Sequence, residues 1–169
     1  KEHQPKVVGI FEMCVWVNSK GVEAIMPMNK GGTQEVDGIK FTMVHDDHSC
    51  GIQDDDGKII YGGEAVGYVI EFENGFNIYH AGDTAVFSDM KLIAEIYKPE
   101  LVMIPIGDLF TMSPTEASYA CRFLSPKYVS PMHYATFPPL TGTPEKLREL
   151  TEDIMDMEII AIKPGETLS

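Results

Sequence analysis

Basic residues are scarce in this chain of 169 residues, and their scarcity excludes one broad class of function. Lysine and arginine together number 13, against 26 aspartate and glutamate residues, so the formal net charge at pH 7 is −13. A protein that binds nucleic acid through its phosphates needs a basic face. We therefore expect no nucleic-acid partner, and we interpret the negative charge as a feature that promotes solubility.

Long apolar runs and paired cysteines are also lacking. No run approaches the roughly 20 apolar residues that span a bilayer, and no signal peptide is visible, so we expect no membrane partner. The three cysteines, Cys14, Cys50 and Cys121, are odd in number and lack the spacing of a metal site. Reduced thiols of this kind are typical of the cytoplasm, and we predict that location.

The elements expected along the chain are of mixed type, and the length fits one domain. Asp37-Gly38 and Asn74-Gly75 each separate two strand-like runs and predict β-hairpins. Residues 53–63 are polar and rich in glycine, which predicts a loop. Helices are predicted at about 12–20, 88–98, 114–124 and 144–155, and further strands at 6–11, 101–106, 128–131 and 158–162. This order indicates an α/β fold of mixed sheets with helices outside.

Two strand-like segments end in polar side chains that suit metal chemistry. The run Ile-Tyr-His-Ala-Gly-Asp-Thr at 78–84 delivers His80 and Asp83 to a glycine turn, and a strand about 50 residues later delivers His133. Aspartate and histidine at separate strand ends can surround a cation in a metal-dependent hydrolase. Each residue also has a structural explanation, since Asp83 could cap the next helix and His133 could be a core histidine.

A third polar cluster, His45-Asp46-Asp47-His48, follows the strand that ends near residue 44. Two histidines and two acids at a strand end can contribute metal ligands. A solvated turn with local Asx-type hydrogen bonds explains the same four residues. Residue types alone leave both explanations open.

Beyond these residues, the chain resembles the metallo-β-lactamase-fold superfamily, in particular a branch of small bacterial and archaeal metal-dependent hydrolases related to the ascorbate-phosphate lactonases. The segments that carry the resemblance span nearly the whole chain: Met-Asn-Lys-Gly-Gly at 28–32, Thr-Met-Val at 42–44 with His-Ser at 48–49, Tyr-His-Ala-Gly-Asp-Thr at 79–84, Asp-Met-Lys-Leu-Ile at 89–93, Pro-Ile-Gly-Asp at 105–108, Phe-Thr-Met-Ser-Pro at 110–114, Pro-Met-His-Tyr at 131–134 and Thr-Phe-Pro-Pro at 136–139. The resemblance implies an αββα sandwich and a metal-dependent hydrolase that acts on a small-molecule ester, lactone or phosphoester.

The resemblance also implies roles for individual residues. His48, Asp83 and His133 match metal ligands, with Asp83 as the carboxylate that bridges two metals, and the catalytic positions are Asp83 and His48. Such a donor set suits Zn²⁺ or another divalent first-row ion, which lowers the pKa of a bound water to about 7 and so supplies a hydroxide. Four further residues match positions that orient ligands or touch substrate, or that are purely structural: His45, His80, Asp108 and Thr111.

One motif of the family has no counterpart, because a His-x-His-x-Asp-His loop is absent from the sequence. We therefore expect a single domain over residues 1–169 whose N-terminal portion is missing, and whose metal is weakly bound or absent. Uncovered apolar surface then predicts a homo-oligomer with a contact near residues 6–17. Two functions remain open: a metal-dependent hydrolase, or a metal-free remnant of the fold with a binding or assembly role.

Overall fold

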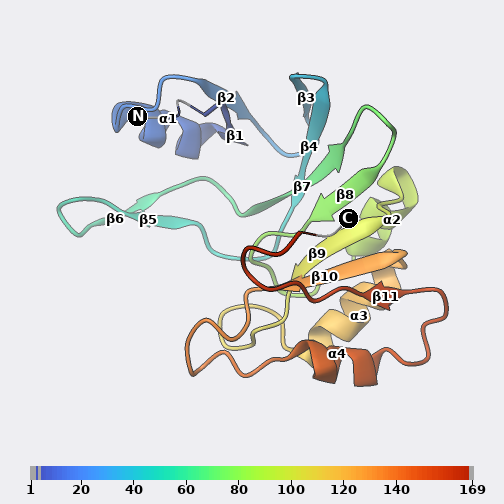
Figure 1. Cartoon of the computed structure of the whole chain (residues 1–169). Coiled ribbons are helices and arrows are strands. Elements are labelled where there is room, and N and C mark those ends of the chain that lie inside the picture. Colours follow the sequence, from blue (N-terminus) through green and yellow to red (C-terminus); the bar gives the residue numbers. More distant parts are fainter. Residues whose placement is uncertain (1–2, 4, 168–169) are drawn as a thin grey trace.

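The computed structural model describes residues 3 and 5–167, which form one seven-stranded sheet, two two-stranded sheets and four helices (Figure 1). The strands are β1 (Val7–Ile10), β2 (Ile25–Met28), β3 (Thr33–Val36), β4 (Ile39–His45), β5 (Gly51–Gln53), β6 (Ile59–Tyr61), β7 (Val66–Glu71), β8 (Asn77–His80), β9 (Leu101–Pro105), β10 (Tyr128–Met132) and β11 (Glu158–Ile159). The helices are α1 (Phe11–Ser19), α2 (Met90–Tyr97), α3 (Pro114–Leu124) and α4 (Pro144–Leu150).

The large sheet has the strand order β11-β10-β9-β8-β7-β4-β3. The pairs β8–β9, β9–β10 and β10–β11 are parallel, whereas β7–β8, β4–β7 and β3–β4 are antiparallel. Strands β8 and β10 lie on either side of β9, so their carboxyl ends reach the same edge of the sheet. That edge is where open α/β sheets commonly place ligands.

One face of the large sheet packs against helices α2, α3 and α4 and contains the hydrophobic core (Figure 1). Tyr79, Val102, Ile104 and Val129 belong to this core and are fully buried. Ser113 starts α3 with a reciprocal capping box to Glu116, which satisfies backbone donors that the first helical turn leaves unpaired. Within the part of the chain that the structure describes, no helix is long and apolar enough to cross a membrane.

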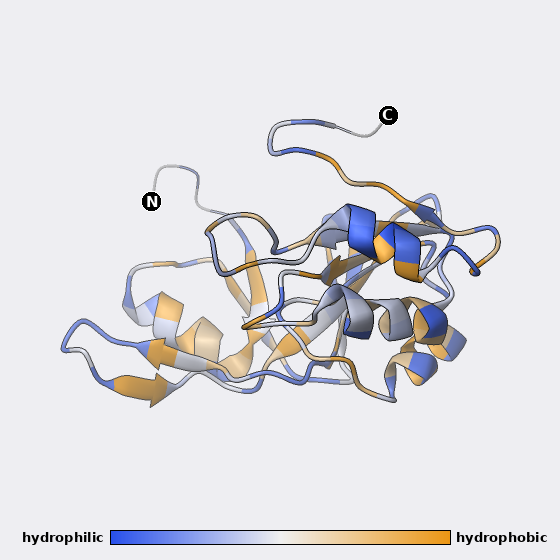
Figure 2. Cartoon of the chain, turned by 90° about the horizontal axis from the view of Figure 1, so that it is seen from below, coloured by the Kyte–Doolittle hydropathy of each residue, from blue (hydrophilic) through white to orange (hydrophobic). Residues whose placement is uncertain are grey.

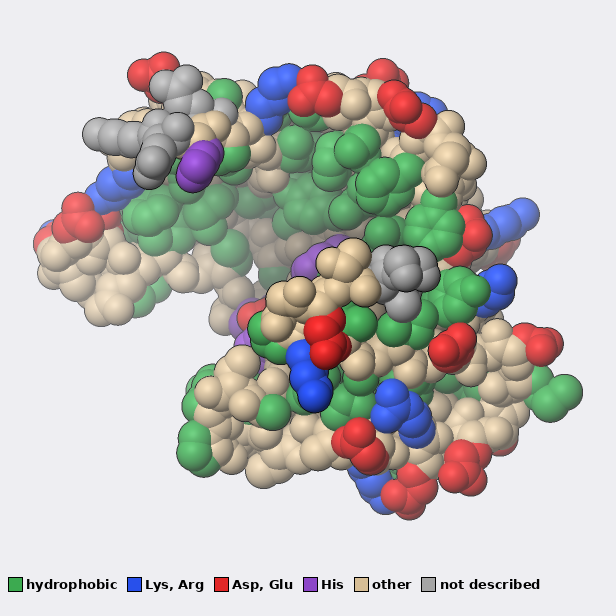
Figure 3. Space-filling view, viewed as in Figure 1, with side chains coloured by type: hydrophobic (Ala, Val, Ile, Leu, Met, Phe, Trp, Pro, Cys, Tyr) green, Lys and Arg blue, Asp and Glu red, His purple; other side chains and the backbone are tan. Residues whose placement is uncertain are grey.

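The opposite face of the sheet is also apolar but is only half-buried. The pairing registers place Phe41, Ile70 and Ile78 in one row across β4, β7 and β8, with Tyr68 and Met103 in the neighbouring row. Figure 3 shows hydrophobic side chains gathered over this part of the sheet. A sheet with apolar residues on both faces is typical of strands that are covered on both sides. We call this surface the open sheet face.

The structure confirms the prediction of a mixed α/β fold with helices outside the sheet. Both hairpins turn where the sequence predicts, at Asp37-Gly38 and Asn74-Gly75. The four helices lie close to their predicted positions, but α4 ends at Leu150 and is followed by turns rather than continuing to residue 155. The last strand is likewise shorter than predicted, covering only Glu158–Ile159.

The prediction of a loop over residues 53–63 is wrong. Short strands β5 and β6 pair there as an antiparallel hairpin, with Ile52 opposite Ile60. The strands of this hairpin contain Ile52, Ile59 and Ile60 (Figure 2), and the acidic residues 54–56 with Gly57 form the turn between them. Three-residue runs are too short for their alternation to stand out against that polar turn. Strand β2, which pairs in parallel with β1, was also not expected from the sequence.

The buried face of the sheet generates a stability prediction. Replacing Ile104, which is fully buried, with alanine leaves a cavity and should lower the free energy of unfolding by about 2–5 kcal/mol. Ile96→Ala is the matched control, because this isoleucine on α2 is 64% exposed and its loss should change stability by less than about 0.5 kcal/mol. Urea unfolding of both variants measures the difference, and equal losses would contradict this placement of the core.

Candidate functional site

Asp83 and His133 meet at the carboxyl edge of the large sheet. The distance from His133 Nε2 to Asp83 Oδ2 is 3.6 Å, which is longer than a hydrogen bond. Both side chains are partly exposed, so they can be reached from solvent. Two donors that each bind one ion at about 2 Å lie at roughly this separation. The structure thus brings together two of the three metal ligands that the sequence indicated.

The backbone on both sides of this pair is tightly constrained. Gly82 has a φ of +64°, and a Cβ there would lie 2.8 Å from Asp46 Oδ2. Gly107, in the loop after β9, lies so close to the loop after β10 that its Cβ would be 2.0 Å from the His133 carbonyl oxygen. His133 itself has a left-handed φ of 53°, which is unfavourable for a residue with a Cβ. Such strain at a polar pair is typical of functional sites.

His48 lies along the same pocket as Asp83 but makes other contacts. Its Nε2 is 3.0 Å from the Phe110 carbonyl oxygen, and its Nδ1 is 2.8 Å from the Ser49 carbonyl oxygen. A neutral imidazole has only one N–H, so it can donate to one of these oxygens and not to both. The second ring nitrogen then faces an oxygen without a proton to share. This arrangement leaves His48 near the pair without joining it.

Asp46 is a buried carboxyl beside the site that the sequence did not single out. It is 3% exposed; Tyr79 donates a hydrogen bond of 3.4 Å to its Oδ1, and its Oδ2 has no partner among the described residues. Burial raises the pKa of Asp46 to about 8, and the charge of Asp83 adds to the rise. The cluster at 45–48 was visible in the sequence, but nothing there indicated which acid turns inward.

The remaining candidates lie around the pair without completing it. His80 Nδ1 accepts a hydrogen bond of 3.1 Å from the Gly82 backbone, and burial lowers the pKa of this imidazole. His45 packs edge-on against Phe87, with its Nδ1 3.4 Å from the Lys30 ammonium. These contacts indicate that His80 supports the turn before Asp83, and that His45 belongs to a separate surface cluster.

Two candidates belong to the loop after β9. The Asp108 carboxylate accepts a hydrogen bond of 2.7 Å from the Leu109 backbone, so it organises its own loop. The Thr111 hydroxyl is buried and has no hydrogen-bond partner among the described residues. Buried polar atoms without partners are rare and often mark functional sites. His133 Nδ1 is a second such atom in this part of the fold.

A pocket of about 460 Å³ runs from this site towards the N-terminal segment. Its polar lining includes Asp46, His48, Glu64 and Asp83, and much of its apolar lining comes from β1. Its volume is in the range of small-molecule sites.

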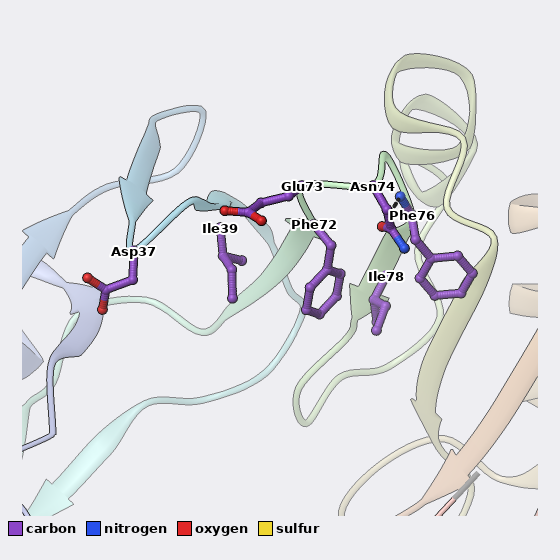
Figure 4. A pocket seen from close by; sticks show the side chains of 7 residues that line it. All are labelled: Asp37, Ile39, Phe72, Glu73, Asn74, Phe76 and Ile78. Carbon is purple, nitrogen blue, oxygen red and sulfur yellow. Dashed lines mark hydrogen bonds between the residues drawn. The ribbon is translucent and has the colours of Figure 1, made fainter. Parts of the chain in front are cut away.

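A larger hollow, of about 680 Å³, lies at the opposite end of the sheet (Figure 4). Its lining combines Phe72 and Phe76 with polar groups such as Asp37 and Glu73 but contains no histidine or cysteine. It therefore lacks the imidazole and thiolate donors that a first-row metal ion prefers.

Asp83 and His133 are of the residue types that bind a divalent first-row ion, but two donors are fewer than such a site needs. Imidazole nitrogen and carboxylate oxygen both suit such an ion. Among the described residues, however, no group of three or more His, Cys, Asp and Glu side chains is arranged to hold one. A catalytic zinc usually has three protein ligands, so a complete centre needs at least one donor beyond Asp83 and His133.

Comparison with known proteins identifies what the chain is similar to. Residues 10–134 match the family described as the β-lactamase superfamily domain. A UPF0173 metal-dependent hydrolase of Koribacter versatilis is 53% identical over 100% of this chain and 71% of its own length. One from Solibacter usitatus is 55% identical over 98% of this chain and 71% of its length.

Among solved structures, Igni18, a metallo hydrolase from the archaeon Ignicoccus hospitalis, superposes with a TM-score of 0.84. It is 31% identical in sequence, and the match covers 99% of this chain and 69% of that one. The similarity of fold therefore extends along almost the entire chain.

The contact between Gly107 and His133 generates the next prediction. Gly107→Ala should push the His133 loop away, shift the His133 ring resonances in NMR spectra, and lower the free energy of unfolding by roughly 1–3 kcal/mol. Gly9→Ala is a milder control, because its Cβ would meet only the Cys14 sulfur, at 3.2 Å. If the two variants behaved alike, the loop contact would not be what positions His133.

Buried Asp46 predicts a pH dependence of stability. Because its folded pKa of about 8 lies above the ordinary value of 3.8, the folded state binds this proton more tightly than the unfolded chain. The stabilisation that the Asp46 proton gives the folded state is fully present below about pH 4 and is lost as pH rises to about 8. The free energy of unfolding falls by at most about 1.4 kcal/mol per pH unit over this range. Asp46→Asn should remove this slope in urea unfolding of chelator-treated protein between pH 5 and 8. Parallel curves for the two proteins would show that Asp46 is not held protonated.

Proposed function

Because the chain belongs to the β-lactamase superfamily, among its UPF0173 metal-dependent hydrolases, we propose that it hydrolyses a small-molecule ester, lactone or phosphoester with a divalent metal ion. The observation that supports this most directly is the Asp83–His133 pair at the carboxyl edge of the sheet. A divalent first-row ion bound there would supply a hydroxide at neutral pH, because it lowers the pKa of its water to about 7. Zinc is the ion that we propose.

The residues of this chain would divide the work of holding that ion. Asp83 contributes a carboxylate oxygen and His133 contributes Nε2, which already faces Asp83. His48 is the third donor that we propose, since it lines the same pocket as Asp83 and a neutral imidazole can offer a ring nitrogen to an ion.

Other residues keep the donors in place. The Gly82 backbone bonds to His80 and so fixes the turn that presents Asp83. Burial disfavours a charge on Asp46, which limits repulsion between this carboxyl and Asp83. Residues that orient ligands commonly matter nearly as much as the ligands themselves.

A second function, assembly without catalysis, has its own supporting observations. The described residues contain no group of three metal donors, and the open sheet face is apolar. Phe11 and Val15 on α1 are 56% and 50% exposed, within the segment where the sequence predicts a contact between copies. Apolar surface of this kind promotes association. Metal content by elemental analysis separates the two functions, because only the hydrolase requires a bound ion.

Asp83 provides the decisive variant. Asp83→Ala should reduce bound zinc and should lower metal-dependent hydrolysis of the active substrate by at least about 100-fold, because a ligand is lost. The substrate is found with a small panel: p-nitrophenyl acetate, a γ-lactone and bis(p-nitrophenyl) phosphate. Asp89→Ala is the control, since this aspartate at the start of α2 makes no helix-capping bond and lies outside the site. Unchanged zinc content and activity in Asp83→Ala would refute the proposed site.

A further inference from the structure

Three exposed hydrophobic side chains lie on the loops that follow β9 and β10, and we call them the apolar rim: Leu109, Phe110 and Phe137. They are 59%, 56% and 42% exposed. The rings of Phe110 and Phe137 are tilted against each other with their centres 6.2 Å apart. The rim is thus one continuous surface built from two loops, those that follow β9 and β10.

The apolar rim is joined to the site through both loops. The Phe110 carbonyl oxygen lies 3.0 Å from His48 Nε2, so the backbone of the rim touches a proposed ligand. Phe137 follows His133 on the same loop, and that loop returns to the core at Leu140, which is 4% exposed. The rim and His133 therefore belong to the same pair of loops at the carboxyl edge of the sheet.

The two loops that carry the rim contain residues with an unfavourable backbone conformation. Asp108, Leu109 and Ala135 have left-handed φ values of 67°, 62° and 57°, which residues with a Cβ rarely adopt. Met112, shortly after the rim, is fully buried, so this loop turns from exposed to buried apolar side chains within a few residues. Strained backbone that leaves large apolar side chains in solvent is better explained by a ligand than by folding.

The charges around the site favour a neutral ligand. The pocket carries the acids Asp46, Glu64 and Asp83, and none of the described residues that line it is lysine or arginine. Glu64 is paired with Lys30, whereas Asp83 is half-exposed. The net charge of −13 adds a long-range repulsion of anions. The described residues that line this pocket therefore offer a phosphoester no lysine or arginine partner.

We propose that the apolar rim binds the alkyl or aryl substituent of a neutral ester or lactone, and so selects the substrate of the reaction. This inference rests on the proposed hydrolase function and narrows its substrate class. The carbonyl group of the substrate lies at Asp83 and His133, and its apolar substituent lies against Phe110 and Phe137.

A series of p-nitrophenyl esters tests the selection, because only the acyl chain changes from acetyl to butyryl to hexanoyl. With the zinc-loaded protein, kcat/KM should rise at least about tenfold along the series, since four methylenes are added and full burial of each would contribute about fourfold. Phe110→Ala and Phe137→Ala should each lower kcat/KM for the hexanoyl ester about five- to tenfold, mainly through KM, and the acetyl ester should lose less. Tyr119→Ala is the matched control, because this aromatic side chain on α3 is also 56% exposed and lies outside the rim.

Binding without turnover separates this inference from the proposed function. Saturation-transfer NMR with N-phenylhexanamide and acetanilide, which lack a readily hydrolysed ester, should show tighter binding of the hexanamide, and the two rim variants should weaken it. This result would support the rim even if no ester were hydrolysed, in which case only the hydrolase function fails. The rim proposal is overturned if chain length has no effect, if Tyr119→Ala weakens binding equally, or if the rim variants change only the oligomer size measured by light scattering.

Discussion

The close approach of two backbone segments, at Gly107 and at His133, is the constraint on which the site depends. Parallel strands β8, β9 and β10 bring three loops to one edge of the sheet, and the loops after β9 and β10 then pack without a side chain between them. That contact sets the path of the chain at His133, whose left-handed backbone turns its ring towards Asp83. A small residue at position 107 is therefore as necessary to the geometry as the polar residues are.

The buried side chain of Asp46 explains how two acidic residues can lie close together at the site. Asp46 lies under the Gly82 turn, where the absence of a side chain leaves room for its carboxyl. Its burial against Tyr79 favours the neutral form, so two carboxyl groups can be neighbours without two full charges. The two carboxyl groups therefore differ in role. The exposed carboxyl of Asp83 can hold a cation, whereas the buried carboxyl of Asp46 supports the turn at Gly82.

The two faces of the large sheet give the molecule its asymmetry. Helices α2 to α4 bury one face completely, whereas residues such as Phe41, Tyr68 and Ile78 on the other remain half-buried. The candidate site lies where these two environments meet, beside the apolar rim. Membership of a family of metal-dependent hydrolases and the similarity to Igni18 agree with this architecture, in which the chemistry belongs to the loops and the rigidity to the sheet.

Local sequence determined much of the fold and part of the site. Turn chemistry located both long hairpins, and the capping residues Ser113 and Thr143 located the starts of α3 and α4, because these signals act within a few residues. His80, Asp83 and His133 could be recognised from strand-end motifs. Only the tertiary structure decided that Asp83 and His133 meet, that His48 bonds to backbone carbonyl oxygens, and that Asp46 is buried. Those outcomes depend on strand order and on loop packing between residues 26 to 62 positions apart, which no local pattern of residues encodes.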